Sequence, residues 1–275
     1  MAVLLNDIVA TRGDEPAIVD GRGTRTWVQL NERVERLVHA LRDRGLNSGD
    51  CVMAMLGNQA EAIEVALACA HGGWLLVPVN WHWVADEVAY VLGDTDAAAV
   101  VVDARWVEVV TAALALAGAT EAALPSVRLP SVRVLVDGPD GHGADDPPDG
   151  FEGYEELVAS GVPGEIADAE RGGPMFYTSG TTGRPKGVRL RHSAWTYEGA
   201  GVASTHILSE DDLQYLWLPL AHVFGKVLLT LPLQIGFPTA IDGRIDKIVD
   251  NLAVVKPTFM GAAPRIFEKA YGRIK

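Results

Sequence analysis

The sequence predicts an α/β fold of layered, mostly parallel sheets with helices on both faces. Short apolar runs at 51–56, 74–79 and 97–102 indicate buried strands, because runs of this length bounded by polar turns are typical of strands. The segments 59–71 and 86–92 lie between these runs and carry apolar residues at helical spacing. Strands that alternate with helices predict βαβ units. A chain of 275 residues that is 48% hydrophobic can bury the core that such layers need.

The first forty residues predict two helices and a hairpin. A short amphipathic helix is expected at 3–11, and 30–41 has the apolar spacing of a second helix. The strand-like segments 17–20 and 25–28 flank the turn Gly21-Arg22-Gly23. Two such segments joined by a short glycine-containing turn predict a β-hairpin.

Beyond the third buried strand, the chain alternates between regular segments and an acidic loop. We expect an Ala- and Val-rich helix at 104–123, a strand at 132–136 and a helix at 154–158. The segment 137–150 is dense in Asp, Gly and Pro and predicts a mobile acidic loop. An EF-hand-like calcium loop is the alternative, but the ladder of Asp residues and the terminal Glu of that motif are missing.

Charge and cysteine content restrict the classes of function. A net charge of −13 argues against non-specific binding of nucleic acid and against a basic membrane-docking surface. Cys51 and Cys69 fit no metal-binding spacing, and apolar neighbours predict buried free thiols in a reducing compartment. The first residues lack the cationic region of a signal peptide, and no uncharged apolar run reaches the ~18–20 residues of a membrane span. We therefore expect a cytoplasmic protein without a transmembrane segment.

The stretch from Phe176 to Val188 has the composition of a polyphosphate-binding loop. Glycines let a backbone approach its ligand closely, successive N–H groups form a nest for an anion, and Lys186 adds a point charge for phosphate. The stretch is not a Walker A loop, because Lys186 is followed by Gly187 rather than by Ser or Thr. An ordinary flexible surface loop is the alternative. The glycines of the stretch 176–188 are Gly180, Gly183 and Gly187, and its hydroxyl donors are Thr178, Ser179, Thr181 and Thr182.

An apolar segment at 216–225 contains a second group of candidate residues. It includes Pro219, His222 and Phe224, and we expect an apolar strand that ends near the histidine. A histidine in such surroundings is more often a hydrogen-bonded core residue than a functional one. Taken alone, the segment leaves both interpretations of His222 open.

Two motifs resemble a known superfamily. The order Tyr-Thr-Ser-Gly-Thr-Thr-Gly-Arg-Pro-Lys-Gly-Val at 177–188 resembles the phosphate-binding signature of the AMP-forming adenylate synthetases. This superfamily contains acyl-CoA synthetases, luciferases and the adenylation domains of peptide synthetases. The segment 256–269, with its Pro-Thr, Pro-Arg and Glu-Lys pairs, resembles the long-chain acyl-CoA synthetase branch. The likeness runs from about residue 15 to the end of the sequence.

The resemblance implies a fatty-acid–CoA ligase that uses ATP, Mg²⁺ and coenzyme A. In such a reaction a fatty carboxylate forms acyl-AMP, and coenzyme A then displaces AMP. The resemblance places His222 and Phe224 on the wall of the acyl/AMP pocket, Thr178 near Mg²⁺, and Lys186 and His222 among the catalytic residues. It assigns the β- and γ-phosphates to Thr178, Ser179, Gly180, Thr181, Thr182, Gly183 and Lys186.

The resemblance covers the N-terminal portion of these enzymes. The sequence lacks the family's Tyr-Gly-x-Thr-Glu and Thr-Gly-Asp segments and its small C-terminal domain, which predicts a fragment or a naturally shortened relative. A fatty-acyl-AMP ligase that delivers to a carrier protein is one alternative. A non-catalytic remnant that binds nucleotide, acyl chain or a partner is another.

The expected organisation has three parts. Residues 1–136 form a first α/β subdomain, and 137–170 form an acidic loop and a connecting helix. Residues 171–275 form the phosphate-loop-bearing part of a second, incomplete α/β subdomain.

Overall fold

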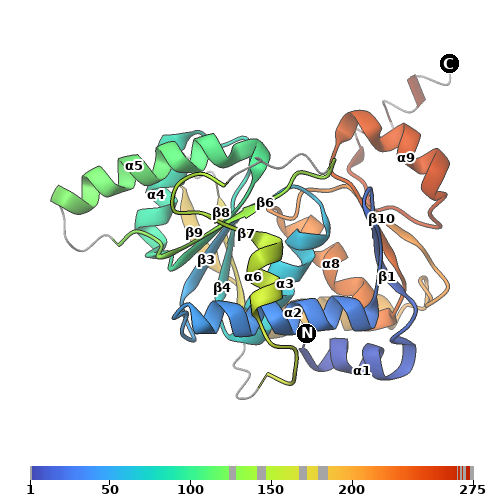
Figure 1. Cartoon of the computed structure of the whole chain (residues 1–275). Helices are drawn as coiled ribbons and strands as arrows, with labels where there is room; N and C mark the ends of the chain where they lie inside the picture. Colours follow the sequence, from blue (N-terminus) through green and yellow to red (C-terminus); the bar gives the residue numbers. More distant parts are fainter. Residues whose placement is uncertain are drawn as a thin grey trace.

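The chain forms two sheets separated and covered by helices (Figure 1). The computed structural model describes residues 2–123, 128–140, 147–166, 172–178 and 185–264, together with Ile266, Glu268, Tyr271 and Gly272. Its helices are α1 (Ala2–Arg12), α2 (Trp27–Asp43), α3 (Ala60–Gly72), α4 (Ala85–Thr95), α5 (Val107–Ala123), α6 (Tyr154–Ser160), α7 (His192–Ala203), α8 (Val223–Ile235) and α9 (Ile248–Val255). Short 3₁₀ turns at Ala104–Trp106 and Ile245–Lys247 precede α5 and α9.

The larger sheet has seven strands. Every neighbouring pair in it is parallel except the last pair, β8 and β9, which is antiparallel. In spatial order its strands are β7 (Glu152–Gly153), β6 (Val132–Val136), β5 (Ala99–Asp103), β3 (Cys51–Met55), β4 (Leu75–Pro78), β8 (Gly173–Thr178) and β9 (Lys186–Arg189).

The smaller sheet joins the N-terminal hairpin to two strands from the last third of the chain. It has the order β10 (Gln214–Leu216), β11 (Thr239–Ile241), β1 (Pro16–Asp20) and β2 (Gly23–Thr26). β1 is parallel to β11 and antiparallel to β2. The predicted hairpin is therefore confirmed, and its first strand pairs with a segment that lies far along the chain.

Both faces of the central strands β3 and β5 are buried, which explains why these strands are almost entirely apolar. Along β3, Val52 and Ala54 pack in the core that also contains side chains of α2, α3, α6 and α8. The alternating residues Met53 and Met55 pack on the opposite face against α4 and α5. The first core reaches Ile18 and Ile241 of the smaller sheet, whose other face packs against α9. The predicted layered, mostly parallel α/β fold with helices on both faces is confirmed.

The expected strand at 25–28 is shorter than predicted, because a helix begins within it. The Thr26 side chain accepts a hydrogen bond from the Gln29 N–H, and the Gln29 side chain accepts one from the Thr26 N–H at 2.9 Å. This capping box stabilises the start of a helix, so α2 begins at Trp27. The prediction was wrong here because two residues with high strand propensity, Trp27 and Val28, follow a helix-capping threonine.

The division of the chain at 136/137 and 170/171 stays a prediction. Strand pairing crosses both of these positions, since β1 pairs with β11 and β4 pairs with β8. The predicted acidic loop at 137–150 lies partly outside the described residues, at 141–146.

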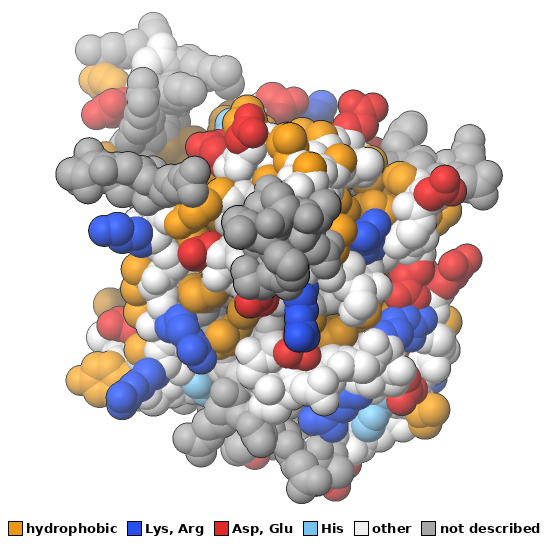
Figure 2. Space-filling view, turned by 90° about the vertical axis from the view of Figure 1, so that its left-hand side faces the viewer, with side chains coloured by type: hydrophobic (Ala, Val, Ile, Leu, Met, Phe, Trp, Pro, Cys, Tyr) orange, Lys and Arg blue, Asp and Glu red, His pale blue; other side chains and the backbone are white. Residues whose placement is uncertain are grey.

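The structure bears on three predictions made from composition: the state of the cysteines, the charge of the surface and the absence of a membrane span. Cys51 and Cys69 are buried free thiols, as predicted. On the side of the molecule where α4 and α5 lie, basic side chains are spread among acidic and uncharged ones (Figure 2). Among the helices in the described ranges, none combines the length and the apolar character needed to cross a bilayer.

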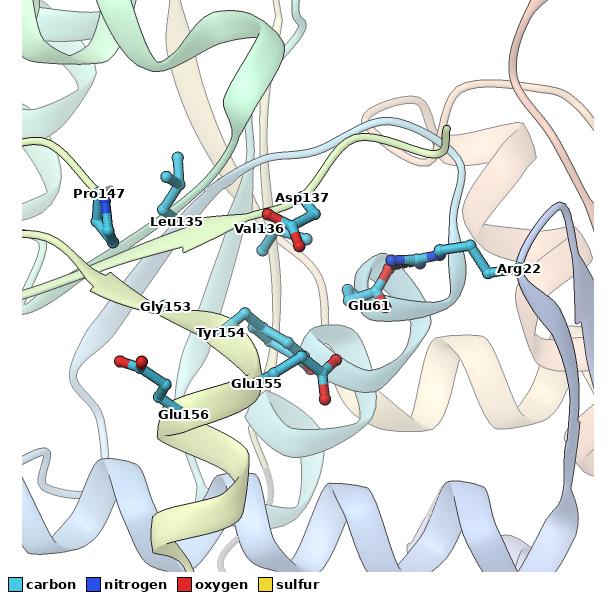
Figure 3. Close-up of a pocket in the computed structure, with 10 residues that line it drawn as sticks. All are labelled: Arg22, Glu61, Leu135, Val136, Asp137, Pro147, Gly153, Tyr154, Glu155 and Glu156. Atoms are coloured by element: carbon cyan, nitrogen blue, oxygen red, sulfur yellow. Dashed lines mark hydrogen bonds and ion pairs between the residues drawn. The ribbon is translucent and has the colours of Figure 1, made fainter. Parts of the chain in front are cut away.

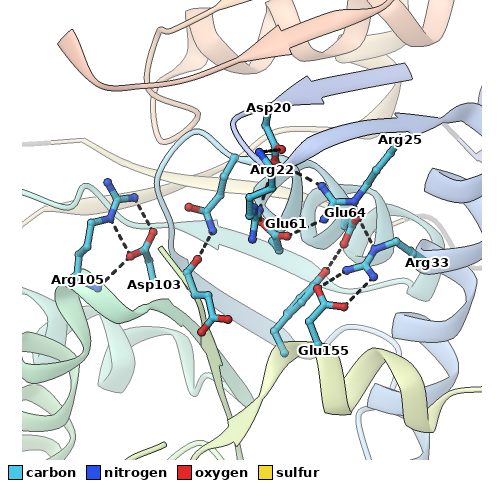
Figure 4. Close-up of polar contacts among 12 residues, drawn as sticks. Asp20, Arg22, Arg25, Arg33, Glu61, Glu64, Asp103, Arg105 and Glu155 are labelled. Carbon is cyan, nitrogen blue, oxygen red and sulfur yellow. Dashed lines mark hydrogen bonds and ion pairs between the residues drawn. The ribbon is translucent and has the colours of Figure 1, made fainter. Parts of the chain in front are cut away.

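Two carboxylates on α3 are buried in a network of arginines (Figure 4). Glu61 and Glu64 are 1% and 0% exposed. Arg25, from the hairpin, lies 3.0 Å from Glu61 and 3.3 Å from Glu64. Arg33, from α2, lies 2.7 Å from Glu64, whose other oxygen accepts a hydrogen bond from the hydroxyl of Tyr154 at 2.8 Å. The network joins α2, α3, α6 and the β1–β2 hairpin.

We expect Glu64→Gln to lower the free energy of unfolding by about 1.5–3 kcal/mol, because it weakens charge-assisted hydrogen bonds to Arg33 and Tyr154 at a buried position, while Glu61 and Glu155 still pair with Arg25 and Arg33. Glu32→Gln is the matched control, since Glu32 forms a half-exposed i,i+4 pair with Arg36 at 2.8 Å. That change is expected to cost less than ~1 kcal/mol. Urea denaturation of both variants measures the difference, and equal losses would show that the buried network contributes no more than a surface pair.

Candidate functional site

The two ends of the predicted phosphate loop are held together by β8 and β9. Thr178, the last residue of β8, is paired with Lys186, the first residue of β9, and both side chains are exposed. Residues paired directly across antiparallel strands have side chains on the same face within ~5.5 Å between Cβ atoms. Thr178 and Lys186 therefore stand side by side at the base of the loop. The predicted ligands Ser179, Gly180, Thr181, Thr182 and Gly183 lie outside the described residues, so their role stays a prediction.

The segment after the loop is a strand before it is a helix. The sequence predicts a helix at 192–201, which the structure confirms as α7. β9 lies between the loop and that helix, so the loop does not lead directly into a helix N-terminus. Backbone pairing with β8 accounts for this strand, because all four residues of β9 pair with residues of β8.

The loop begins at the carboxyl edge of the larger sheet. β8 runs parallel to β4, so Thr178 lies at the same edge as the carboxyl ends of β3, β4 and β5. Open α/β sheets bind ligands at this edge. Tyr177 fixes the end of β8 at this edge. Its ring makes an edge-to-face contact with Trp83, 6.5 Å between centroids, and its hydroxyl donates to Asp94 at 2.5 Å.

His222 is the N-cap residue of α8 and its side chain is exposed. The apolar strand expected near it ends earlier, at Leu216. The backbone then turns through Pro219, whose carbonyl oxygen accepts the His222 N–H at 3.1 Å. A Cβ at Gly225 would lie 2.4 Å from that carbonyl oxygen, so the turn requires glycine there. His222 is not a core residue, and its assignment to the pocket wall stays a prediction, as does that of the 48% exposed Phe224.

A cleft of about 420 Å³ lies where the carboxyl ends of both sheets meet. We call it the strand-end cleft. Its volume is in the range of small-molecule sites in proteins. One of its walls is formed by Pro219, Leu220 and Ala221, the residues that lead directly to His222. The other lining residues come from segments that follow β3, β4, β5, β6, β10 and β11, and include Gly57, Asn58, Trp81, Arg105, Trp106, Trp217, Asp242 and Arg244.

Aromatic rings and an arginine form one wall of the strand-end cleft. Trp81 stacks on Trp106 with 5.6 Å between ring centroids, and the Arg105 guanidinium lies 4.4 Å from the Trp106 ring centre. The buried carboxylate of Asp103 holds Arg105 through contacts of 2.9 and 2.6 Å. The sequence alone predicts a surface or interdomain corner at Trp81-His82-Trp83, because a loop that follows a strand often carries such residues. The position of Trp81 directly after an apolar strand was the available signal that it lines a ligand cleft.

A second arginine lies on the opposite wall. Arg244 lies 2.7 Å from Asp242, and hydrogen bonding to that carboxylate raises the pKa of Arg244. Burial alone would raise the pKa of Asp242, but the hydrogen bonds from Arg244 outweigh it and lower that pKa. Asn58 donates to the Leu218 carbonyl at 2.7 Å and joins this wall to the end of β3. Arg105 and Arg244 are both paired with aspartates, so an anionic ligand that binds either arginine would share that guanidinium with the aspartate.

A smaller cavity of about 230 Å³ lies beside the ion-pair network (Figure 3). Arg22 and Glu61 point toward one another at one end, and Tyr154 and Glu155 lie at the start of α6. None of the described residues that the sequence predicts for the site lines it. Among the described part of the chain, no group of three or more His, Cys, Asp or Glu side chains is arranged to hold a metal ion.

Lys226, one turn into α8, is a buried lysine that sequence reasoning missed. Its side chain is 2% exposed, and within the described ranges its ammonium makes no hydrogen bond or ion pair. Burial lowers the pKa of Lys226 from its ordinary value of 10.5 to about 8. The available signal was a single lysine between the apolar segments 216–225 and 227–233.

The position of the described site residues is that of a ligand-binding α/β protein, with a loop and a cleft at the carboxyl edge of parallel strands. The model of the AMP-binding enzyme family matches residues 5–271, and the chain belongs to that family. The predicted resemblance to the N-terminal portion of the AMP-forming adenylate synthetases is confirmed.

Curated relatives differ in the acid that their names give. The chain is 31% identical over 226 residues to an indoleacetate–CoA ligase of Aromatoleum aromaticum, covering 80% of this chain and 41% of the relative. It is 28% identical over 263 residues to a long-chain-fatty-acid–CoA ligase of Mycobacterium bovis, covering 92% and 41%. The chain thus spans about two fifths of the length of these relatives.

A crystal structure from Rhodopseudomonas palustris, of a protein assigned as a long-chain-fatty-acid CoA ligase, has the same fold. It superposes with a TM-score of 0.80 at 25% identity, over 96% of this chain and 63% of the other.

We expect Lys226→Met to raise the free energy of unfolding by up to ~3 kcal/mol at pH 7, because it removes a lone buried charge. Between pH 8 and 10.5 the unfolded wild-type chain binds more protons than the folded chain, so wild-type stability rises with pH there. The difference between the variants should therefore shrink toward pH 10.5.

Urea denaturation at several pH values measures this difference. Lys247→Met, which removes an exposed lysine, is the control and should show no such pH dependence. A constant difference across the pH range would contradict the expected titration of Lys226.

Proposed function

We propose that this chain carries the part of an AMP-forming acid–CoA ligase that binds the ATP phosphates and the acid. The observation that carries the proposal is the cross-strand pair of Thr178 and Lys186 at the base of the 179–185 loop. This pair stands at the carboxyl edge of a parallel sheet, where α/β proteins bind nucleotides. Membership in the AMP-binding enzyme family supports the choice of ATP.

The proposed reaction has two steps. A carboxylate oxygen attacks the α-phosphorus of ATP, the bond to the β-phosphate breaks, and acyl-AMP and pyrophosphate form. The thiolate of coenzyme A then attacks the acyl carbonyl carbon, and AMP leaves with its electron pair. Negative charge grows on the leaving pyrophosphate in the first step, so positioned cations and N–H donors lower its barrier.

Each described site residue has a role in this proposal. Lys186 pairs with the β- and γ-phosphates, together with the loop residues 179–183. The exposed hydroxyl of Thr178 is the kind of oxygen ligand that Mg²⁺ takes, and the ion would neutralise phosphate charge when bound. His222 and Phe224 form the pocket wall beside the reacting carboxylate, since the residues just before them line the strand-end cleft.

A fatty acid is the proposed substrate, and coenzyme A the proposed acceptor. The fatty acid is supported by the likeness of 256–269 to long-chain acyl-CoA synthetases and by the Mycobacterium bovis relative. We place the activity in the cytoplasm, where the two free thiols persist. An assay that offers the adenylate to coenzyme A and to an acyl carrier protein tests the acceptor, and transfer only to the carrier would overturn coenzyme A.

We expect Lys186→Ala to weaken ATP binding about 10- to 100-fold and AMP binding far less, because the lost charge faces the β- and γ-phosphates. Arg189→Ala is the matched control, since it removes one exposed charge from the other end of β9. It should change both affinities only slightly. Titration calorimetry measures all four values, and equal losses for ATP and AMP in Lys186→Ala would remove this residue from the proposed role.

We expect His222→Ala to slow adenylate formation by roughly 10- to 100-fold, the scale of a lost positioned group. The melting temperature should stay within a degree or two, because the side chain is exposed and makes no capping hydrogen bond. The rate of pyrophosphate release measures adenylate formation, and thermal unfolding measures the melting temperature. His206→Asn serves as the control, since Asn accepts the positive φ of 53° at that exposed turn. An unchanged rate would exclude His222 from the site.

A further inference from the structure

Lys226 lies in a small apolar pocket at the start of α8, which we call the α8 pocket. Its walls come from β3, α3, β4 and α8 and include Ala54, Ala66, Leu76, Leu220 and Leu229. The volume of about 30 Å³ holds about two water molecules or one carboxylate group. It is too small for a hydrocarbon chain.

Two independent features make the α8 pocket favourable for an anion. The first is the ammonium of Lys226, which is 2% exposed and has no counter-ion among the described residues. The second is the N-terminus of a 13-residue helix, which carries partial positive charge from its unpaired N–H groups. A buried cation without a partner is costly, so an anion that enters the pocket would remove that cost.

Neighbouring groups do not neutralise Lys226. The titratable group acting on it is the thiol of Cys69 on α3, and burial raises the pKa of that thiol to about 12. Cys69 therefore stays uncharged at neutral pH. The remaining described walls of the α8 pocket are aliphatic.

The α8 pocket adjoins the strand-end cleft. The two spaces share Leu56, Leu220 and Ala221 as lining residues. Lys226 follows His222 by one helical turn, and the Lys226 N–H donates to the His222 carbonyl at 3.1 Å. Side chains four residues apart lie on the same face of an α-helix, one turn of ~5.4 Å apart along the axis, so one small ligand can contact both His222 and Lys226.

We propose that Lys226 is a specificity-determining residue that binds a second carboxylate of the acid substrate, which narrows the proposed fatty acid to an aliphatic dicarboxylic acid. This inference rests on the proposed function, because it places the carboxylate to be activated beside His222. The second carboxylate enters the α8 pocket and pairs with the ammonium, while the methylene groups between the two contact the shared apolar wall. A monocarboxylic acid leaves the ammonium without a partner.

The test compares acids of equal length by titration calorimetry, without ATP, on the whole chain. The probes are adipate, hexanoate and monomethyl adipate, with wild type, Lys226→Met, Lys226→Arg and the surface control Lys247→Met. Wild type and Lys247→Met should bind adipate at least tenfold tighter than the other two acids. Lys226→Met should lose this preference, and Lys226→Arg should keep part of it. Thermal unfolding of each variant confirms that it is folded.

Several results would overturn the proposal. Equal affinity of wild type for the three acids would do so, as would a preference for adipate that survives Lys226→Met. Acetate provides a further arm, because acetate binding that Lys226→Met abolishes, without a preference for adipate, would assign the pocket to a free small carboxylate. These measurements need no nucleotide, so they stand apart from the comparison of ATP and AMP affinity that tests the proposed function.

Discussion

The burial of two carboxylates on α3 is the constraint on which the arrangement of the surrounding elements depends. Glu61 and Glu64 have almost no contact with solvent, and carboxylates at that depth require cationic or hydrogen-bonding partners. The partners come from the hairpin of the smaller sheet, from α2 and from Tyr154 at the start of α6. Because α3 begins two residues after Asn58, the same contacts fix one side of the strand-end cleft. A substitution that breaks these ion pairs would thus alter the cleft by displacing α3, rather than by displacing a strand of either sheet.

Local sequence patterns predicted the helices and strands well. They predicted poorly which distant segments pair with one another. The alternation of apolar runs and helical segments predicted β3, β4 and β5 and the helices between them, because each pattern is complete within a few residues. The pairing of β1 with β11 could not be predicted in this way, since each of these short strands also fits other neighbours. The partners of Glu61 and Glu64 lie 31 to 90 residues away in the sequence, where neither spacing nor propensity gives information.

The candidate site was predicted where chemistry is concentrated in one segment and missed where it is assembled from several. The 177–188 motif combines its hydroxyls, glycines and lysine in a single loop, so it could be recognised directly. The lining of the strand-end cleft brings together Trp81, Trp106 and Arg244 from three separate strand ends. Lys226 was missed because a lysine among apolar residues can point to solvent or inward, and only the packing of α8 against α3 and the sheet determines the direction.

The parallel pairing of β1 with β11 has a consequence for the order of events during synthesis. The two strands are separated by roughly 220 residues, which a ribosome translates at ~5–20 residues per second, so β1 waits on the order of ten seconds or more for its partner. Contacts of such high sequence separation also slow folding, because a long loop must close before they form. During this interval the hairpin can already pair with α3 through Arg22 and Arg25. Those ion pairs would keep an otherwise unpaired strand edge docked on the nascent chain and away from other chains.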